Sequence, residues 1–540
     1  MLVVFRMLLL FLSIFGYFSF VRVKTKIEVS FIPVVVFSGI GTVIFLSGLL
    51  NILKFSSIVL FFIGIFMNKY SIYLISDKKY IWQVFYFFLA MIFCFFILKD
   101  SLWIHYDNFS HWGLVAKEIV TYNQFPNFQS DLIQFQSYVT GSASFIYYIS
   151  KITGLHSEGF MSVAQSWLVL AACSTFFVWI PENSKKYSFP VIIFSLLLFI
   201  VNIQPYDLLV DTLLTALSLA TINIIVFYKN SLQKIPYILG IMFLFLISVK
   251  TSGIFFVISS LSLMIFYSFR MKKELRFKIW LQTFYVVVGS VFVNILWKAH
   301  VSYVFIEGNK SKHSFSLAGY KENLLDKGKS KIVEIMFQYA QRIFSFDNII
   351  LILFVLIGGI LIYSIFVKKK IFGIELVIFS SLTYIVYHIN LLAMYIVSMP
   401  YDEAKHLDSF SRYNMTIVLY VLGILLIYSL KYSTRISKNC FYLTMLILVV
   451  FSLLNKDSFN QFITSRHTAD RYKIEERLRS ISYKKGIPTI IQIKRKSLSK
   501  GYLWFLLRYD LHTKDVTINY LDEDVSNNNG ESVQILTIDY

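Results

Sequence analysis

Apolar residues occur along this chain in long, nearly continuous runs, and polar residues gather between the runs. A run of roughly twenty apolar residues is long enough to cross the hydrocarbon core of a membrane as a helix. The runs therefore predict a polytopic membrane protein with about fourteen spanning helices. The predicted spans cover about residues 1–20, 31–53, 56–75, 80–98, 158–180, 189–203, 208–228, 235–249, 252–269, 280–297, 349–366, 372–396, 415–430 and 440–454.

The basic residues between the runs predict the orientation of the chain, because Lys and Arg accumulate in short cytoplasmic loops. We expect the remaining loops, and the tail from Asn455, to lie outside the cytoplasm. The loops predicted inside are 21–30, 68–79, 181–188, 229–234, 270–279, 367–371 and 431–439. The loops predicted outside are 99–157, 204–207, 298–348 and 397–414.

One apolar segment, 138–155, does not fit this alternation. If it crossed the membrane, the orientation of every upstream segment would reverse. We therefore predict that it is re-entrant or interfacial, and a true span is the alternative.

Charged residues return in the tail, which predicts a small extracytoplasmic α+β domain at 456–540. A domain of this size has a marginally stable hydrophobic core, so we expect it to pack against the outer loops. Helices are predicted at 472–481 and 498–507, and strands at 488–494, 516–521 and 533–539. The predicted fold class is thus an all-α polytopic membrane protein with a C-terminal α+β domain. The N-terminal spans occupy 1–99, the first large outer loop 100–157 and the transmembrane core 158–455.

The composition agrees with a membrane protein, since 57% of the residues are hydrophobic and only 15% are charged. Soluble domains carry about 25% charged residues. The net charge of +20 does not indicate a nucleic-acid partner, because the basic residues cluster in short loops between spans.

The three cysteines, Cys94, Cys173 and Cys440, lack the spacing of metal ligands. The stretch from Leu8 to Phe20 has no small-residue cleavage site after it, so we interpret it as part of the first span.

The first large outer loop contains a carboxylate surrounded by aromatic residues. Asp107 lies close to Trp103, Tyr106 and Trp112 in the sequence. A carboxylate at a membrane surface can act as a general base that activates an acceptor hydroxyl. The alternative is an N-cap at the start of an interfacial helix. If the segment is helical, Asp107 and His111 project from one face, since they are four residues apart.

Two aspartates, Asp207 and Asp211, lie at the junction of two predicted spans. Ionisable groups at the edge of a span are costly and usually have a partner or a function. Asp207 has the alternative of capping the following helix. Asp211 lies one helical turn further into the predicted span than Asp207. This position favours a functional role for Asp211 over a capping role.

Two cationic features follow on the same predicted side. Lys250 begins the sequence KTSG between two apolar runs and either snorkels to the interface or holds a phosphate as a point charge. Arg412 precedes Tyr413 at the start of a span. Its guanidinium suits bidentate phosphate binding, and an interfacial Arg-Tyr anchor is the alternative.

The outer loop 298–348 mixes charged and aromatic residues. Ile332, Ile335, Met336 and Tyr339 have the spacing of one helical face. We predict either an interfacial amphipathic helix or a surface connector.

Together and in this order, these features resemble the polytopic GT-C glycosyltransferases, a superfamily that includes protein O-mannosyltransferases and aminoarabinose transferases. Members carry a pattern close to D-[EN]-x-x-x-[HW]-W-x-x-x-A-K in the first long outer loop. The corresponding residues are Asp107-Asn108, His111-Trp112 and Ala116-Lys117, with two residues rather than three between Asn108 and His111. The segment FQSYVTGSASFIYY that follows lacks the two prolines usual in the family, which leaves the subfamily open.

The resemblance implies a plasma-membrane enzyme that transfers a sugar, with inversion, from a polyprenyl-phosphate-linked donor to a glycan, lipid or protein acceptor. It implies that Asp107 is the catalytic base and that Arg412 and Lys250 lie near the lipid phosphate. The other implied substrate-binding residues are His111, Trp112, Lys117, Asp207, Asp211 and Tyr413. Some relatives need a divalent metal and others do not, so the cofactor stays open. The alternatives are a transporter or flippase for lipid-linked glycans and a glycan polymerase or ligase.

Overall fold

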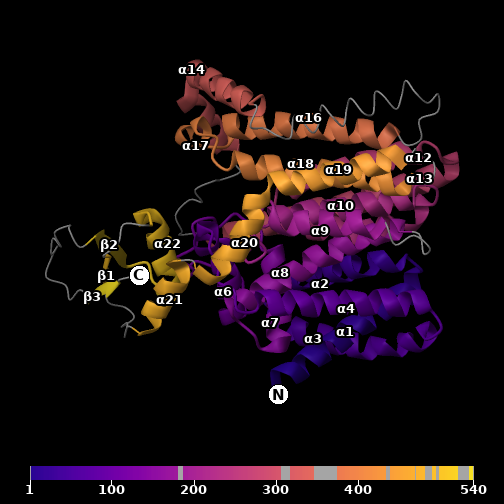
Figure 1. The fold of residues 1–540 in the computed structure, drawn as a ribbon, viewed down its shortest axis with the longest axis horizontal. Helices are drawn as coiled ribbons and strands as arrows, with labels where there is room; N and C mark the ends of the chain where they lie inside the picture. Colours follow the sequence, from indigo (N-terminus) through magenta and orange to yellow (C-terminus); the bar gives the residue numbers. More distant parts are fainter. Residues whose placement is uncertain are drawn as a thin grey trace.

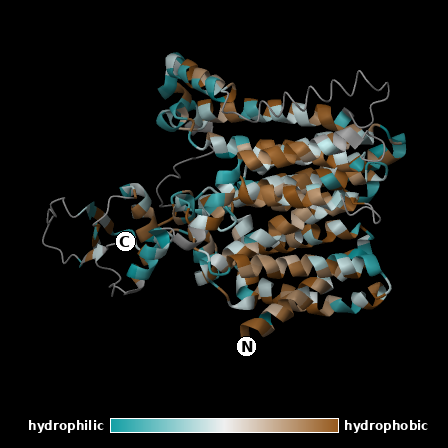
Figure 2. Ribbon diagram, viewed as in Figure 1, coloured by the Kyte–Doolittle hydropathy of each residue, from teal (hydrophilic) through white to brown (hydrophobic). Residues whose placement is uncertain are grey.

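Most of the chain forms one bundle of helices that lie side by side, and the C-terminal residues form a smaller unit at one end of the bundle (Figure 1). Apolar residues are concentrated along the bundle helices, and hydrophilic residues gather at the helix ends (Figure 2). This arrangement is the one expected for a helical membrane protein. The computed structural model describes residues 2–180, 187–305, 317–345, 374–432, 438–468, 470–480, 489–493, 498–520 and 534–538.

Each predicted span within the described residues falls on a helix of the bundle. The helices are α1 (Leu2–Thr25), α2 (Ile32–Leu49), α3 (Leu53–Met67), α4 (Lys78–Leu98), α8 (Glu158–Ser174), α9 (Ser188–Ile200), α10 (Asp211–Phe227), α11 (Pro236–Val249), α12 (Gly253–Ser268), α13 (Lys273–Val304), α16 (Ile374–Val397), α18 (Phe410–Lys431) and α19 (Lys438–Leu454). Short 3-10 helices are η1 (Val29–Phe31), η2 (Asn68–Leu74), η3 (Thr175–Trp179) and η5 (Leu232–Lys234). The predicted span 349–366 lies outside the described residues.

Eight of the described helices are long and apolar enough to cross a membrane. They are α1, α2, α3, α4, α8, α13, α16 and α18, three of them counted with an adjoining 3-10 turn. The predicted count of about fourteen is therefore not confirmed. The difference of six has two sources. Five helices, α9, α10, α11, α12 and α19, have only 13 to 17 residues, fewer than the roughly twenty needed to cross the hydrocarbon core. The sixth predicted span, 349–366, lies outside the described residues.

Helix α10 lies at the centre of the packing and contacts α8, α12 and α18. All its residues from Asp211 to Val226 are buried. Small residues allow α1 and α3 to approach closely, because a Cβ atom on Gly16 of α1 would lie 1.9 Å from the carbonyl oxygen of Gly64 on α3. Close packing replaces the hydrophobic effect as the force that joins helices within a membrane.

Three short helices, α5 (Tyr106–Ser110), α6 (Trp112–Tyr122) and α7 (Gly141–Thr153), lie between α4 and α8 in the chain. Helix α7 corresponds to the segment 138–155 and is almost wholly buried among its neighbours. Its 13 residues span about 20 Å, which is too short for a helix that crosses the membrane. The alternative of a full span at 138–155 is therefore not supported.

The segment from Asp107 to His111 is not one continuous helix, so the condition for a helical face shared by these two residues is not met. His111 has φ −153° and ψ −77°, and it separates α5 from α6. The N-cap prediction for Asp107 is also wrong, because His105 is the N-cap of α5 and its Nδ1 accepts a hydrogen bond from the Asp107 N–H at 3.2 Å. Asp107 instead lies in the first turn of α5.

The loop 298–348 contains α14 (Leu317–Ile343), which packs against α16 and α17 (Tyr401–Lys405). Gly328 breaks the helix with a φ of 59°, in the left-handed region that favours glycine. Ile335 and Tyr339 are buried, whereas Met336 is exposed. The predicted apolar face therefore exists, but it packs against protein and is narrower than expected.

The tail contains the predicted helices and strands and one further helix. It consists of α20 (Lys456–Thr468), α21 (Asp470–Ser480), β1 (Thr489–Ile493), α22 (Lys500–Leu511), β2 (Val516–Tyr520) and β3 (Gln534–Ile538). The strands form a parallel sheet in the order β2-β1-β3, in which Ile491 pairs with Ile518 and with Leu536. Helix α22 packs against α5, so the tail rests on the outer loop as expected.

Candidate active site

The side chain of Arg412 joins two carboxylates that are far apart in the sequence. It lies in the first turn of α18, where its Nη1 donates to Asp107 Oδ2 at 2.6 Å. Its Nε lies 3.5 Å from Asp211 Oδ2 at the start of α10. Its Nη2 also donates to Ser409 Oγ at 3.3 Å. Three segments of the chain therefore meet at one guanidinium.

A second cation completes the network on the opposite side of Asp211. Lys250 Nζ lies 2.7 Å from Asp211 Oδ1 and 5.1 Å from the centre of the Tyr413 ring. Lys250 occupies the break between α11 and α12, and its extended backbone lets the side chain turn toward α10. Two cations and two carboxylates thus alternate from Asp107 to Lys250, which limits the cost of burying each charge.

Asp207 holds the segment before α5 in place. Its Oδ1 accepts hydrogen bonds from the N–H groups of Ile104 and His105, at 2.9 and 3.0 Å, and from Asn108 Nδ2 at 2.6 Å. The Asn108 Oδ1 in turn accepts from the Leu208 N–H at 2.9 Å. Burial raises the pKa of the Asp207 carboxyl. The prediction that Asp207 caps the next helix is wrong, because α10 begins at Asp211 and Asp207 instead ties two loops together.

His111 and Trp112 belong to an aromatic cluster behind Asp107. The His111 ring lies 4.6 Å from the Trp112 ring and 4.7 Å from the Tyr138 ring, measured between centroids. Burial lowers the pKa of His111 to about 3, although the Asp107 charge opposes the shift. His111 is therefore neutral at physiological pH. Its position suits a role in shaping the site rather than in carrying charge.

Lys117, which the sequence predicts as a substrate-binding residue, lies instead at the contact with the tail. Its Nζ donates to the Tyr509 carbonyl oxygen at 3.0 Å and lies 4.0 Å from the centre of the Tyr509 ring. Burial lowers the pKa of Lys117. The side chain therefore stabilises the packing of α22 against the outer loop.

A buried charge cluster that sequence reasoning missed connects the tail to the outer loop. Arg471 of α21, whose side chain is 1% exposed, lies 3.1 Å from Glu158 Oε1 and 2.9 Å from Asp510 Oδ1. Its guanidinium also lies 5.6 Å from the centre of the Phe109 ring in α5. Burial, with the Glu158 charge nearby, raises the pKa of Asp510 to about 7. The sequence carries no signal for this cluster, because Arg471 lies in the first turn of an ordinary polar helix.

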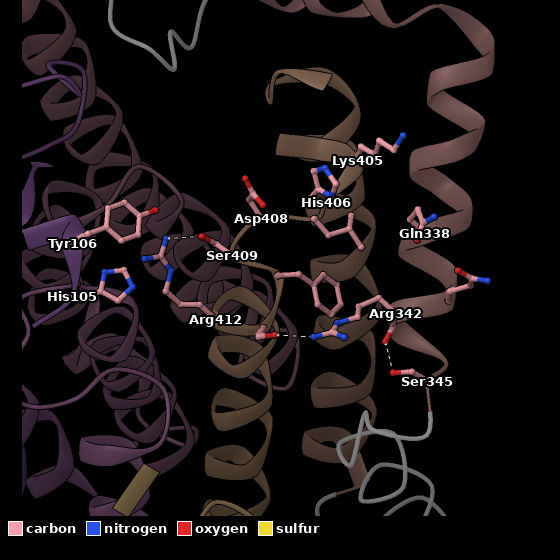
Figure 3. A pocket seen from close by; sticks show the side chains of 14 residues that line it. His105, Tyr106, Gln338, Arg342, Ser345, Lys405, His406, Asp408, Ser409 and Arg412 are labelled. Atoms are coloured by element: carbon pink, nitrogen blue, oxygen red, sulfur yellow. Dashed lines mark hydrogen bonds between the residues drawn. The ribbon is translucent and has the colours of Figure 1, made fainter. Parts of the chain in front are cut away.

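A cavity of about 920 Å³ opens beside Arg412 (Figure 3). His105 and Tyr106 line one wall, and residues of α14, α17 and the start of α18 line the others. The charged side chains in the lining are mostly basic. They are Arg342, Lys405 and Arg412, with Asp408 as the acidic exception. Lys405 lies 3.1 Å from Glu334 and Arg412 lies 2.6 Å from Asp107, so nearby carboxylates compensate part of this positive charge. The excess of basic side chains in the lining itself favours an anionic ligand.

The arrangement offers a carboxylate and a guanidinium in direct contact at the edge of a basic cavity. Among the described residues, no group of three or more His, Cys, Asp and Glu side chains is placed to hold a metal ion. Comparisons of the chain with protein-family models, with curated proteins and with solved structures find no match. Functional inference therefore rests on the geometry of this site.

Proposed function

We propose that this protein is a membrane glycosyltransferase that moves a sugar from a polyprenyl-phosphate-linked donor to an acceptor at the outer face of the plasma membrane. The observation that carries the proposal is the network from Asp107 through Arg412 and Asp211 to Lys250. These four residues lie far apart in the sequence and are among the nine that the sequence pattern groups into one site. Their contact beside a basic cavity supports the proposal that they act together in one active site.

The cavity suits the phosphate of a lipid-linked donor. Such a lipid places its phosphate at the headgroup level while its chain stays in the bilayer. Arg412 lines the cavity and offers a planar set of donors that matches phosphate oxygens. It also lies in the first turn of α18, where the helix dipole favours an anion.

In the proposed reaction, the oxygen of an acceptor hydroxyl attacks the anomeric carbon of the donor sugar. The hydroxyl proton passes to the Asp107 carboxylate, and the bond from the anomeric carbon to the phosphate oxygen breaks. The electron pair leaves with the polyprenyl phosphate, whose charge Arg412 stabilises. A single displacement of this kind inverts the anomeric configuration.

The network also suggests how Asp107 becomes available as a base. Arg412 contacts both Asp107 and Asp211. A phosphate that enters the cavity competes for the guanidinium and weakens its contact with Asp107. Lys250 then keeps the buried Asp211 charge neutralised. This assigns Lys250 to Asp211 rather than directly to the phosphate.

The test uses the purified protein in liposomes with a panel of labelled polyprenyl-phosphate hexoses and membrane extract as the acceptor source. The proposal predicts release of polyprenyl phosphate together with label on the acceptor. Movement of intact labelled lipid across the bilayer, without release, would contradict it and favour a transporter. Transfer only from a polyprenyl-diphosphate oligosaccharide would favour a glycan polymerase or ligase instead.

A further inference from the structure

A cluster of basic side chains lies at the end of the bundle opposite Arg412. Helix α18 has 22 residues and is therefore about 33 Å long. Arg412 lies in its first turn, and Lys431 is its last residue. Lys431 Nζ donates to the carbonyl oxygen of Val226, near the end of α10, at 2.6 Å. The cluster around Lys431 is therefore separate from the candidate active site.

Two lysines of this cluster contact the ring of one buried tyrosine, Tyr432. The Nζ atoms of Lys229 and Lys431 lie 5.6 and 5.7 Å from the centre of the ring. Lys229 Nζ also donates to the Tyr432 hydroxyl at 3.1 Å. The side chain of Lys229 is only 21% exposed, and Lys431 is half-buried. The two ammonium groups therefore repel each other in a place that water reaches poorly.

One carboxylate compensates part of this positive charge. Glu375 Oε1, in the first turn of α16, lies 3.7 Å from Lys229 Nζ and 3.5 Å from Arg270 Nη1. Lys431 forms no ion pair with any residue that the structure describes. Three cations therefore share a single carboxylate, which leaves an excess of two positive charges. Such an excess favours an anionic ligand.

Tyr267 of α12 adds an unpaired hydroxyl to the cluster. The residue is 1% exposed, and its hydroxyl has no hydrogen-bond partner in the described part of the chain. The centre of its ring lies 5.7 Å both from Lys229 Nζ and from the guanidinium carbon of Arg270. A buried hydroxyl without a partner is costly. An anionic oxygen that accepts a hydrogen bond from Tyr267 would remove this cost.

The cluster is most accessible at Arg270, whose side chain is 55% exposed. The Arg270 guanidinium lies 5.1 Å from the centre of the Phe266 ring, which is itself 45% exposed. Lys229, Arg270 and Lys431 all belong to loops that the distribution of basic residues places on the cytoplasmic side. Anionic phospholipids are abundant in the cytoplasmic leaflet, and basic pockets between membrane helices bind their headgroups.

We propose that Lys229, Arg270 and Lys431 bind the phosphate headgroup of an anionic phospholipid, and that the Tyr267 hydroxyl donates a hydrogen bond to it. A lipid fits better than a free phosphate, because Arg270 connects the half-buried cations to the exposed apolar ring of Phe266. The acyl chains then lie along the outside of the bundle. This site goes beyond the proposed function and does not depend on it, because it lies at the other end of α18.

The test is native mass spectrometry of the purified full-length protein, titrated in detergent with phosphatidylglycerol. The double variant Lys229→Gln/Lys431→Gln is expected to weaken binding of the first lipid about tenfold or more, because two charge-assisted contacts are lost. The matched control is Lys272→Gln/Lys273→Gln, which removes two exposed lysines from the turn between α12 and α13. The control should bind within about twofold of the unaltered protein. Equal weakening in both double variants would show attraction to overall charge and overturn the site.

Two single variants keep the test decisive if the double variant folds poorly. Arg270→Gln changes an exposed side chain, and Tyr267→Phe removes only the unpaired hydroxyl. Each is expected to weaken lipid binding severalfold without lowering the thermal unfolding midpoint of the lipid-free protein. Unchanged lipid affinity in both would contradict the proposal.

The source of the phosphate is tested with two further ligands. Phosphatidylcholine should bind at least about tenfold more weakly than phosphatidylglycerol, because its headgroup has no net charge. Inorganic phosphate should fail to displace the bound lipid at equal concentration. Equal binding of phosphatidylcholine would overturn the anionic assignment. Displacement by inorganic phosphate would show a site for a free anion and overturn the lipid assignment.

Discussion

At the scale of single residues, the predicted polar residues make contacts of different kinds in the structure. Asp107 and Arg412 are in direct contact at the cavity. Asp207 and Lys117 are held in structural contacts. The sequence could identify the set, because charged residues near apolar spans are costly and need a reason. The sequence could not distinguish site residues from structural residues, because the distinction depends on which partner each side chain contacts in three dimensions.

Glu118 on α6 shows how burial at this scale leads to a pH dependence. Its side chain is buried beside the outer loop, and burial, assisted by the Asp131 charge, raises its pKa from 4.5 to about 7. A raised carboxyl pKa favours the folded state below the unfolded pKa. That stabilisation is lost as the pH rises from about 4.5 through about 7, and it amounts to about 3 kcal/mol at most.

We therefore expect Glu118→Gln to unfold at a higher temperature than the unaltered protein at pH 8 and at nearly the same temperature at pH 5. The measurement is the thermal unfolding midpoint of both proteins in the same detergent. A difference between the two proteins that is independent of pH would show that Glu118 is ionised in the folded protein throughout this range.

At the scale of elements, apolar runs predicted the helices well because a membrane requires every backbone group to bond within its own helix. The pattern failed where packing against protein decides the structure. His111 divides α5 from α6, and the apolar segment around 138–155 forms the short buried helix α7. Neither outcome follows from periodicity, because both depend on neighbours that are distant in the sequence.

The contact between the tail and the outer loop depends on Arg471. Removing one partner of a buried charge cluster typically costs about 3–5 kcal/mol, because the remaining charges lose their compensation. We expect Arg471→Ala to release the tail, since Glu158 and Asp510 would face each other without the guanidinium that joins them. Limited proteolysis should then cut the chain near residue 455 much faster than in the unaltered protein.

The control for that experiment is Lys473→Ala on the same helix. Lys473 is 54% exposed and lies 3.5 Å from Asp470, so its loss should have almost no effect on cleavage. Equal protease resistance of Arg471→Ala and Lys473→Ala would show that the buried cluster does not hold the tail in place.

At the scale of the whole molecule, α14, α17 and the tail all lie at one end of the bundle (Figure 1). Residues of α14 and α17 line the cavity. The distribution of basic loops predicts that this end faces away from the cytoplasm. The tail begins after α19, and its contact with α5 links the C-terminal unit to the loop that carries Asp107.

The orientation is tested with single cysteines introduced after Cys94, Cys173 and Cys440 are replaced by alanine. A cysteine at Gln129, exposed in the outer loop, should react with a membrane-impermeant maleimide in intact cells. A cysteine at Lys69, exposed at the opposite predicted side, should react only after the membrane is opened. The reverse labelling pattern would place the cavity on the cytoplasmic side and exclude a reaction at the outer face.

The central claim is that the Asp107 carboxylate takes the acceptor proton during sugar transfer. The direct test is the transfer rate of Asp107→Asn against Asp131→Asn, a half-exposed aspartate of the same loop that pairs with Lys514. Asparagine still accepts the hydrogen bond from Arg412 but cannot take the proton. We predict that Asp107→Asn keeps its thermal stability and loses transfer by about 10²-fold or more, while Asp131→Asn stays within about twofold of the unaltered protein. Full transfer by Asp107→Asn would contradict the account.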